Sequence, residues 1–393
     1  MKTNLSSKIK LDSIPSRYYA PEDEIQLAAL TREEKIDTRI YETSSEGSEG
    51  IAEHVVNAMV RAEAKRGKFV MALGAGNSVS AVYSALVDLY KAGRVSFKNT
   101  VVFNLCDFYT EGADSAASTL SLLKENFLDH IDILPENIHS FSTTCPRQQV
   151  GAMCRDYENQ IENAGGIDLC LCQIGAHGAL GLNEPGSTAS SSCRLVLLSA
   201  EQRQNVVNTY KVGKAPTTGL TLGMGNILAS RRIIAMAWGE NRSAIVGKTV
   251  EGEVTPAIPS SMLQTHSRTT LVLDINAAEG LTRISHPWLV TNCEWNDKLI
   301  RRAIVWLCEQ TGKPILKLTN QDYNDHGLGE LLAIYGSGYN VNIKVFNELQ
   351  HTITGWPGGK PNADDTYRPE RANPYPKRVI IFSPHPDDDV ISM

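Results

Sequence analysis

One loop carries a pair of side chains suited to acid–base chemistry. Residues 175–187 read GAHGALGLNEPGS, and His177 and Glu184 are their only titratable side chains. An imidazole and a carboxylate within hydrogen-bond reach can exchange protons with a bound molecule. In the alternative interpretation, Glu184 braces the loop and His177 is solvated. The sequence alone leaves both interpretations open.

A second pair, Cys106 and Asp107, lies near the end of the strand-like run NTVVFNLCDFY (99–109). A thiol with an ordinary pKa of about 8.5 is a poor base at neutral pH unless a cation lowers that pKa. Asp107 is therefore the better ionised candidate. Neighbouring residues of a strand face opposite sides, so only one of the two can face a given site.

A third candidate region could hold an anion. The stretch GAGNS (74–78) follows an apolar run and precedes a helical pattern, which makes Gly76, Asn77 and Ser78 candidate ligands. Backbone amides at such a helix start attract phosphate. The loop matches neither a P-loop nor G-x-G-x-x-G, so a plain turn is the alternative. Arg194 and Arg242 are further candidates, and either can instead form a surface salt bridge.

The elements that position these residues alternate along the chain. Strand-like runs at 38–47, 68–78, 99–109, 167–178, 217–230 and 269–281 are interleaved with helical patterns such as 48–65, 79–93, 118–131 and 155–164. This alternation predicts an α/β fold, a doubly wound and mostly parallel sheet with helices on both faces. Ligands of such sheets bind at the carboxyl ends of the strands, where the loops named above lie.

The alternation defines the expected domains. Residues 1–37 are an N-terminal leader, 38–285 the main domain, and 286–354 an α/β extension with a helix at 296–310. Residues 355–378 are rich in Pro, Gly and charge and indicate a linker. Residues 379–393 read as a strand running into an acidic loop. We expect that the natural protein continues, or that this chain ends within a second domain.

Composition limits the possible functions. The 393 residues carry a net charge of −6, which disfavours nucleic-acid binding. No apolar run approaches the roughly 20 residues that a membrane span needs, and the start lacks a signal peptide. The eight cysteines show no metal-type spacing and are expected to be reduced. We therefore expect a cytoplasmic protein with no membrane or nucleic-acid partner.

Several stretches together resemble the glucosamine-6-phosphate deaminase (isomerase) family over roughly residues 38–285. They are KAGRVSFKNTVVFNL, NFLDHIDILPENIH, LNEPGS and GKTVEG. The resemblance implies a Rossmann-like sugar-phosphate fold, a small sugar phosphate as ligand, no cofactor and self-association into a homo-oligomer. It also implies the conversion of glucosamine 6-phosphate to fructose 6-phosphate and ammonia, with an aspartate moving a proton between C2 and C1 and a histidine assisting ring opening.

The chain departs from the family pattern at both catalytic positions. Cys106 stands at the position of the proton-transfer aspartate, and Ala179 at that of the histidine. Glu184 matches the glutamate that orients this histidine. In the phosphate loop Ala75 and Val79 replace a threonine and a proline.

Among the anion ligands, Arg242 replaces a phosphate-binding lysine and keeps the charge. Arg194 matches a family arginine near the site, whereas Asn208 stands where some members carry a second phosphate arginine. Neighbouring His177 and Asp107 could rescue the chemistry only with shifted geometry.

The last residues resemble another family. SPHPDDDV (383–390) is similar to the opening motif of zinc-dependent sugar N-deacetylases, in which His385 and Asp388 would bind metal and Asp387 would act as base. The remaining ligand would lie outside this chain, so no functional zinc site is expected. Three hypotheses stay open: an impaired or altered deaminase, a non-catalytic protein that binds a sugar phosphate, and an oligomerisation scaffold.

Overall fold

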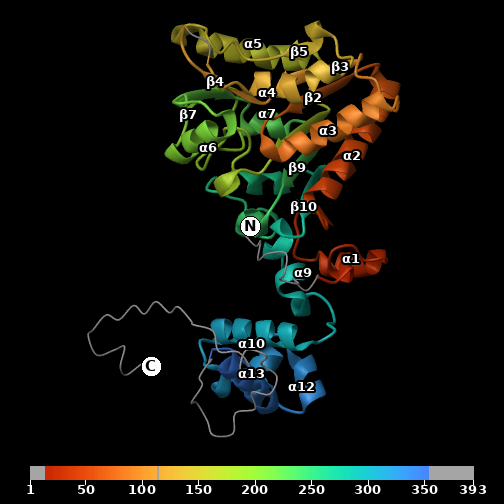
Figure 1. Ribbon diagram of the computed structural model, residues 1–393, viewed down its shortest axis with the longest axis vertical. Coiled ribbons are helices and arrows are strands. Elements are labelled where there is room, and N and C mark those ends of the chain that lie inside the picture. Colours follow the sequence, from red (N-terminus) through yellow and green to blue (C-terminus); the bar gives the residue numbers. More distant parts are fainter. Residues whose placement is uncertain (1–13, 113–114, 354–393) are drawn as a thin grey trace, which may run out of the picture. The chain divides into compact units, whose positions relative to one another are not determined.

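The computed structural model describes residues 14–112 and 115–353 and divides the chain into two compact units, Met1–Glu294 and Trp295–Met393 (Figure 1). The described part of the expected leader holds helix α1 (Glu24–Leu30). Its N-cap is Asp23, whose side chain accepts a hydrogen bond from the amide of Ile25. The division between the units falls at Glu294, later than the expected boundary at residue 285. The expected linker and the residues His385, Asp387 and Asp388 lie outside the described residues.

A seven-stranded sheet organises the first unit. Its strands, in spatial order, are β1 (Asp37–Tyr41), β10 (Thr269–Asp274), β9 (Ile233–Ala237), β6 (Leu169–Gln173), β2 (Phe69–Leu73), β3 (Thr100–Asn104) and β5 (Ile138–His139). Every pairing in this sheet is parallel. The predicted α/β fold with a mostly parallel sheet is therefore confirmed.

Helices cover both faces of this sheet, as the buried strands require. Alternate residues of β2 point to opposite faces, so Phe69, Met71 and Leu73 pack in one core cluster while Val70 and Ala72 pack in the other. The first cluster includes residues of α2 (Ser44–Arg66), α3 (Asn77–Lys91) and α4 (Thr119–Asn126). The second includes residues of α5 (Val150–Asn163), α7 (Met224–Leu228) and α8 (Ser243–Val250).

A smaller antiparallel sheet stands beside the carboxyl ends of the main strands. It consists of β4 (Cys106–Tyr109), β8 (Thr218–Thr221) and β7 (Arg194–Leu197), in that order. The run 99–109, expected as one strand, thus breaks at Leu105 between β3 and β4. Helix α6 (Ala200–Tyr210) connects β7 to β8 and lies on this sheet through a cluster that includes Phe108, Leu182 and Val206.

The described part of the second unit contains helices only, which corrects the expected α/β extension. They are α10 (Asp297–Thr311), α11 (Asn320–Asp325), α12 (Gly329–Tyr335) and α13 (Gly338–Ile353), and the short α9 (Thr282–Ser285) closes the first unit. Their core includes Ile304, Leu307 and Leu331. Among the described helices of the whole chain, none has the length and apolar character needed to cross a bilayer.

Candidate functional site

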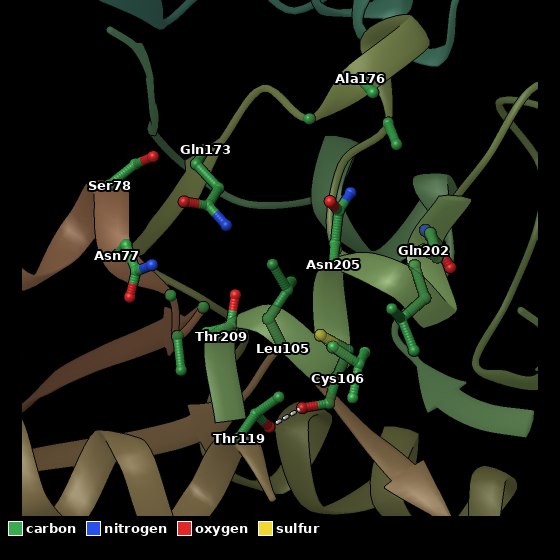
Figure 2. A pocket seen from close by; sticks show the side chains of 18 of the residues that line it. Asn77, Ser78, Leu105, Cys106, Thr119, Gln173, Ala176, Gln202, Asn205 and Thr209 are labelled. Atoms are coloured by element: carbon green, nitrogen blue, oxygen red, sulfur yellow. Dashed lines mark hydrogen bonds between the residues drawn. The ribbon is translucent and has the colours of Figure 1, made fainter. Parts of the chain in front are cut away.

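A cavity of about 430 Å³ opens at the carboxyl ends of the parallel strands, where the fold predicts a ligand site (Figure 2). It brings together seven of the nine residues that the sequence singled out: Gly76, Asn77, Ser78, Cys106, His177, Glu184 and Arg242. Two others, Asp107 and Arg194, do not line it.

The helix start at one wall of the cavity is suited to an anion. Strand β2 ends at Leu73, and α3 begins at Asn77 after Gly76, which adopts φ 151° and gives no side-chain cap. This φ favours glycine, whereas the nearest neighbour of a Cβ atom at position 76 would be the flexible side-chain amide of Gln173, at 2.8 Å from Nε2. The first amides of a helix lack partners within the helix and carry partial positive charge. Arg242 lines the same cavity and adds a full positive charge.

Cys106 lines the cavity, but its thiol is not a base. Burial, and next the carboxylate of Asp107, raise the pKa of Cys106 to about 12. The thiol is therefore protonated at neutral pH. Figure 2 shows its sulfur on the cavity floor beside Leu105, with the Cys106 carbonyl accepting a hydrogen bond from Thr119.

Asp107 does not line the cavity, and its expected role in the chemistry stays a prediction. The carboxylate is buried and accepts hydrogen bonds from the amides of Thr119 (2.8 Å), Phe108 (2.8 Å) and Leu120 (3.2 Å). It also accepts one from the hydroxyl of Ser118. Burial raises the pKa of Asp107 against the opposing effect of these donors. The Asp107 side chain thus links β4 to the start of α4 through hydrogen bonds.

His177 and Glu184 both reach the cavity, but they are paired with other residues. Nε2 of His177 lies 2.9 Å from Oε2 of Glu201, in the first turn of α6. Glu184 accepts a 2.6 Å hydrogen bond from the hydroxyl of Ser199, which caps the same helix. Of the two interpretations that the sequence left open, a His177–Glu184 pair and a bracing Glu184 with a solvated His177, the contacts match the second: each residue has its own contact with α6. His177 is 69% exposed and has a left-handed φ of 54°.

Arg194 lies apart from the cavity, in a separate surface depression that Glu184 and Ser187 also line. Its guanidinium donates hydrogen bonds to the hydroxyl of Ser187 (3.0 Å) and the carbonyl of Ser192 (3.3 Å). In this geometry Arg194 braces the loop that follows Glu184, and its contact with a ligand stays a prediction.

One wall of the cavity was missed by sequence reasoning. Helix α6 presents Gln202, Asn205, Val206 and Thr209 to it, and Gln173 at the end of β6 completes the set (Figure 2). The spacing of 202, 205, 206 and 209 is that of one helix face, which was the available signal. The Oε1 atoms of Gln173 and Gln202 are buried and have no hydrogen-bond partner among the described residues.

No group of three or more His, Cys, Asp or Glu side chains in residues 14–112 and 115–353 could hold a metal ion. The eight cysteines are free thiols. The cavity itself offers a helix start suited to an anion, amide and hydroxyl groups on two walls, and the exposed His177–Glu201 pair at the rim.

Known proteins share both the sequence and the fold. The whole chain is 53% identical to a glucosamine-6-phosphate deaminase-like protein of Bacteroides thetaiotaomicron, and it spans 59% of that relative's length. It is 35% identical to a glucosamine-6-phosphate deaminase of Halothermothrix orenii over 54% of this chain and 88% of the relative.

Two solved structures share the fold. A monomeric glucosamine-6-phosphate deaminase, 27% identical, superposes with a TM-score of 0.57 over 62% of this chain and 100% of its own. A 6-phosphogluconolactonase from Trypanosoma brucei, 18% identical, superposes with a TM-score of 0.51 over 63% of this chain and 99% of its own. Residues 42–272 also match the family described as glucosamine-6-phosphate isomerases/6-phosphogluconolactonase. On this likeness, the chain belongs to the family of glucosamine-6-phosphate isomerases and 6-phosphogluconolactonases.

Proposed function

We propose that this chain binds a hexose or amino-hexose 6-phosphate in the cavity at the α3 start, and that its glucosamine-6-phosphate deaminase activity is strongly impaired. The reference reaction converts glucosamine 6-phosphate to fructose 6-phosphate and ammonia. One observation carries the proposal. The cavity has groups suited to an anionic sugar, while a protonated thiol and a methyl group occupy positions 106 and 179.

The binding half of the proposal rests on complementarity. The open start of the 15-residue helix α3 and the charge of Arg242 suit a phosphate group. The side-chain amides of Gln173, Gln202 and Asn205 can each donate to and accept from sugar hydroxyls. Two of these amides have a buried oxygen that a hydroxyl donor would satisfy.

The chemical half rests on the missing proton carriers. Moving a proton from C2 to C1 requires an ionised base beside the sugar. With a pKa of about 12, only about 10⁻⁵ of the Cys106 thiol is ionised at pH 7. Ala179 carries no proton, and Asp107 is held by the start of α4. The chain therefore lacks, at positions 106 and 179, both groups that the family uses there.

The test compares the wild type with a Cys106→Asp, Ala179→His double variant. We expect the wild type to release ammonia from glucosamine 6-phosphate on the order of 10²–10⁴-fold more slowly than the double variant. Calorimetry with glucose 6-phosphate should show binding to the wild type and a weaker affinity for Arg242→Gln. Turnover by the wild type at the rate of the double variant would refute the impairment, and absence of binding would favour the scaffold hypothesis.

The His177–Glu201 pair favours a second candidate, an altered acid–base activity at the rim of the cavity. A His177→Gln variant separates the two. If the wild type shows any turnover of a sugar phosphate, this second candidate requires that the variant lose it while still binding glucose 6-phosphate. Self-association and a cytoplasmic location remain predictions, and sedimentation velocity would test the former.

A further inference from the structure

A second cavity, of about 620 Å³, lies at the other edge of the main sheet. Seven of its lining side chains are Arg or Lys, and Asp168 is the one acid among them. We propose that this basic cavity is a binding site for a compact polyanion, a small molecule that carries two or more phosphate groups. The proposal concerns residues outside the candidate sugar-phosphate site and does not depend on the function proposed for that site.

The direction of the strands separates the basic cavity from the sugar-phosphate cavity. Phe69 begins β2, and Asp168 directly precedes β6. Arg232 and Arg268 directly precede β9 and β10. Since all these strands are parallel, their amino ends meet at one edge of the sheet and the sugar-phosphate cavity lies at the opposite edge. The two cavities share no lining residue.

Three of the cations are partly neutralised. Arg66 and Arg231 both form ion pairs with Oδ1 of Asp168, whose Oδ2 accepts a hydrogen bond from the amide of Val70. Arg231 also donates to the carbonyls of Gly165 and Gly166. Arg39 lies 3.8 Å from Oδ2 of Asp37. The contacts with Arg66, Arg231 and Val70 occupy both carboxylate oxygens of Asp168, the one acid that lines the basic cavity.

Four cations remain without an acid. Arg61 and Lys65 project from the last turns of α2, and Arg232 and Arg268 from the strand starts; none forms an ion pair with a carboxylate in the described part of the chain. His54 adds no counter-charge. Nε2 of His54 lies 2.5 Å from Arg39, and burial, Arg39 and Arg232 all lower its pKa.

Such crowding is unfavourable without a ligand. Like charges that share a concave surface repel one another and raise the local positive potential. The chain as a whole carries a net charge of −6, so this concentration of cations is a local feature. Arginine side chains bind phosphate oxygens in a bidentate manner. A volume of about 620 Å³ is within the range of small-molecule pockets, which favours a compact ligand over a nucleic-acid duplex.

The experiment uses inorganic tripolyphosphate as the probe and the full chain as the protein. We expect calorimetry to show one binding event, weaker at higher salt because charge interactions are screened. An Arg232→Gln, Arg268→Gln double variant should weaken this binding on the order of tenfold or more, since charged hydrogen bonds are lost. The matched control is Lys124→Gln, a surface cation of α4, which should bind tripolyphosphate as the wild type does.

A second measurement is the melting temperature. Without ligand, the melting temperature of the double variant should equal or exceed that of the wild type, because two unpaired like charges are removed. Tripolyphosphate should raise the melting temperature of the wild type more than that of the double variant. Unchanged affinity in the double variant would overturn the proposal. Displacement of tripolyphosphate by a duplex oligonucleotide that binds more tightly would also overturn it, in favour of a nucleic-acid surface.

Discussion

At the scale of residues, Cys106 and Asp107 are neighbours with opposite surroundings. The Cys106 side chain faces the cavity, where burial keeps its thiol protonated, and the Asp107 side chain faces the amides at the start of α4. A carboxylate is thus present in the chain, one residue away from the position at which the family reaction needs it. Simple side-chain alternation along β4 accounts for the difference.

Gln173 provides a residue-scale prediction for the sugar-phosphate cavity. Its Oε1 atom is buried and has no partner among the described residues, and its amide lies against the start of α3, the proposed phosphate site. A Gln173→Leu variant removes this unsatisfied atom, so stability should stay equal or increase. The same variant loses a hydrogen bond to the ligand, so the affinity for glucose 6-phosphate should fall by about tenfold. Calorimetry and thermal melts measure the two effects.

The matched control is Gln204→Leu, in α6 but outside the cavity lining. It should leave the affinity unchanged. If Gln173→Leu bound glucose 6-phosphate as tightly as the wild type, the assignment of this wall to the sugar would be wrong.

At the scale of elements, close backbone contacts position the cavity residues. Arg242 directly precedes α8, and α8 packs against the turn at 277–280. The contact is tight, because a Cβ atom at position 280 would lie 2.1 Å from the carbonyl oxygen of Ser243, the first residue of α8. Glycine at position 280 thus sets how deeply α8, and with it Arg242, sits against the sheet.

A Gly280→Ala variant tests this positioning. The overlap with Ser243 should push α8 outward, lower the free energy of unfolding by about 1–3 kcal/mol and weaken glucose 6-phosphate binding through Arg242. Gly213→Ala is the matched control, since a Cβ atom there meets nothing within 4 Å. Chemical denaturation and calorimetry supply the measurements. Equal affinity in Gly280→Ala and the control would contradict the role of this contact.

The sequence predicted the parallel sheet well, because buried parallel strands are continuous apolar runs such as FVMAL in β2. It did not predict where one run divides. Residues 99–109 resemble one continuous strand, yet β3 ends at Asn104, and Cys106 begins a strand that pairs with β8 instead. That pairing partner is distant in sequence, so local pattern cannot reveal it. For the same reason the contacts of His177 and Glu184 with α6 could not be predicted.

At the scale of the whole molecule, the chain combines a family domain with a separate helical unit. Every residue that lines either proposed cavity belongs to residues 1–294. The helical unit has its own buried residues and its own ion pair, in which Nζ of Lys313 lies 2.7 and 2.9 Å from the two oxygens of Asp322. The amide and hydroxyl of Thr319 also donate to Asp322 and start α11. The stability of this unit should therefore depend on the ionisation of Asp322.

Acid should act on the helical unit through this carboxylate. Hydrogen bonds from Lys313 and then Thr319 lower the pKa of Asp322 to about 2, whereas an unfolded aspartate titrates near about 3.9. A lowered pKa in the folded state stabilises the fold above the unfolded value, and this stabilisation is lost as the pH falls from about 4 to about 2. An Asp322→Asn variant should lack this part of the acid transition, because the amide has no charge to lose. Circular dichroism across this pH range would show it as a shallower loss of helix, whereas Asp325→Asn in the same helix should follow the wild type. If Asp322→Asn and Asp325→Asn gave the same acid profile, the ion pair would not be what ties the helical unit's stability to pH.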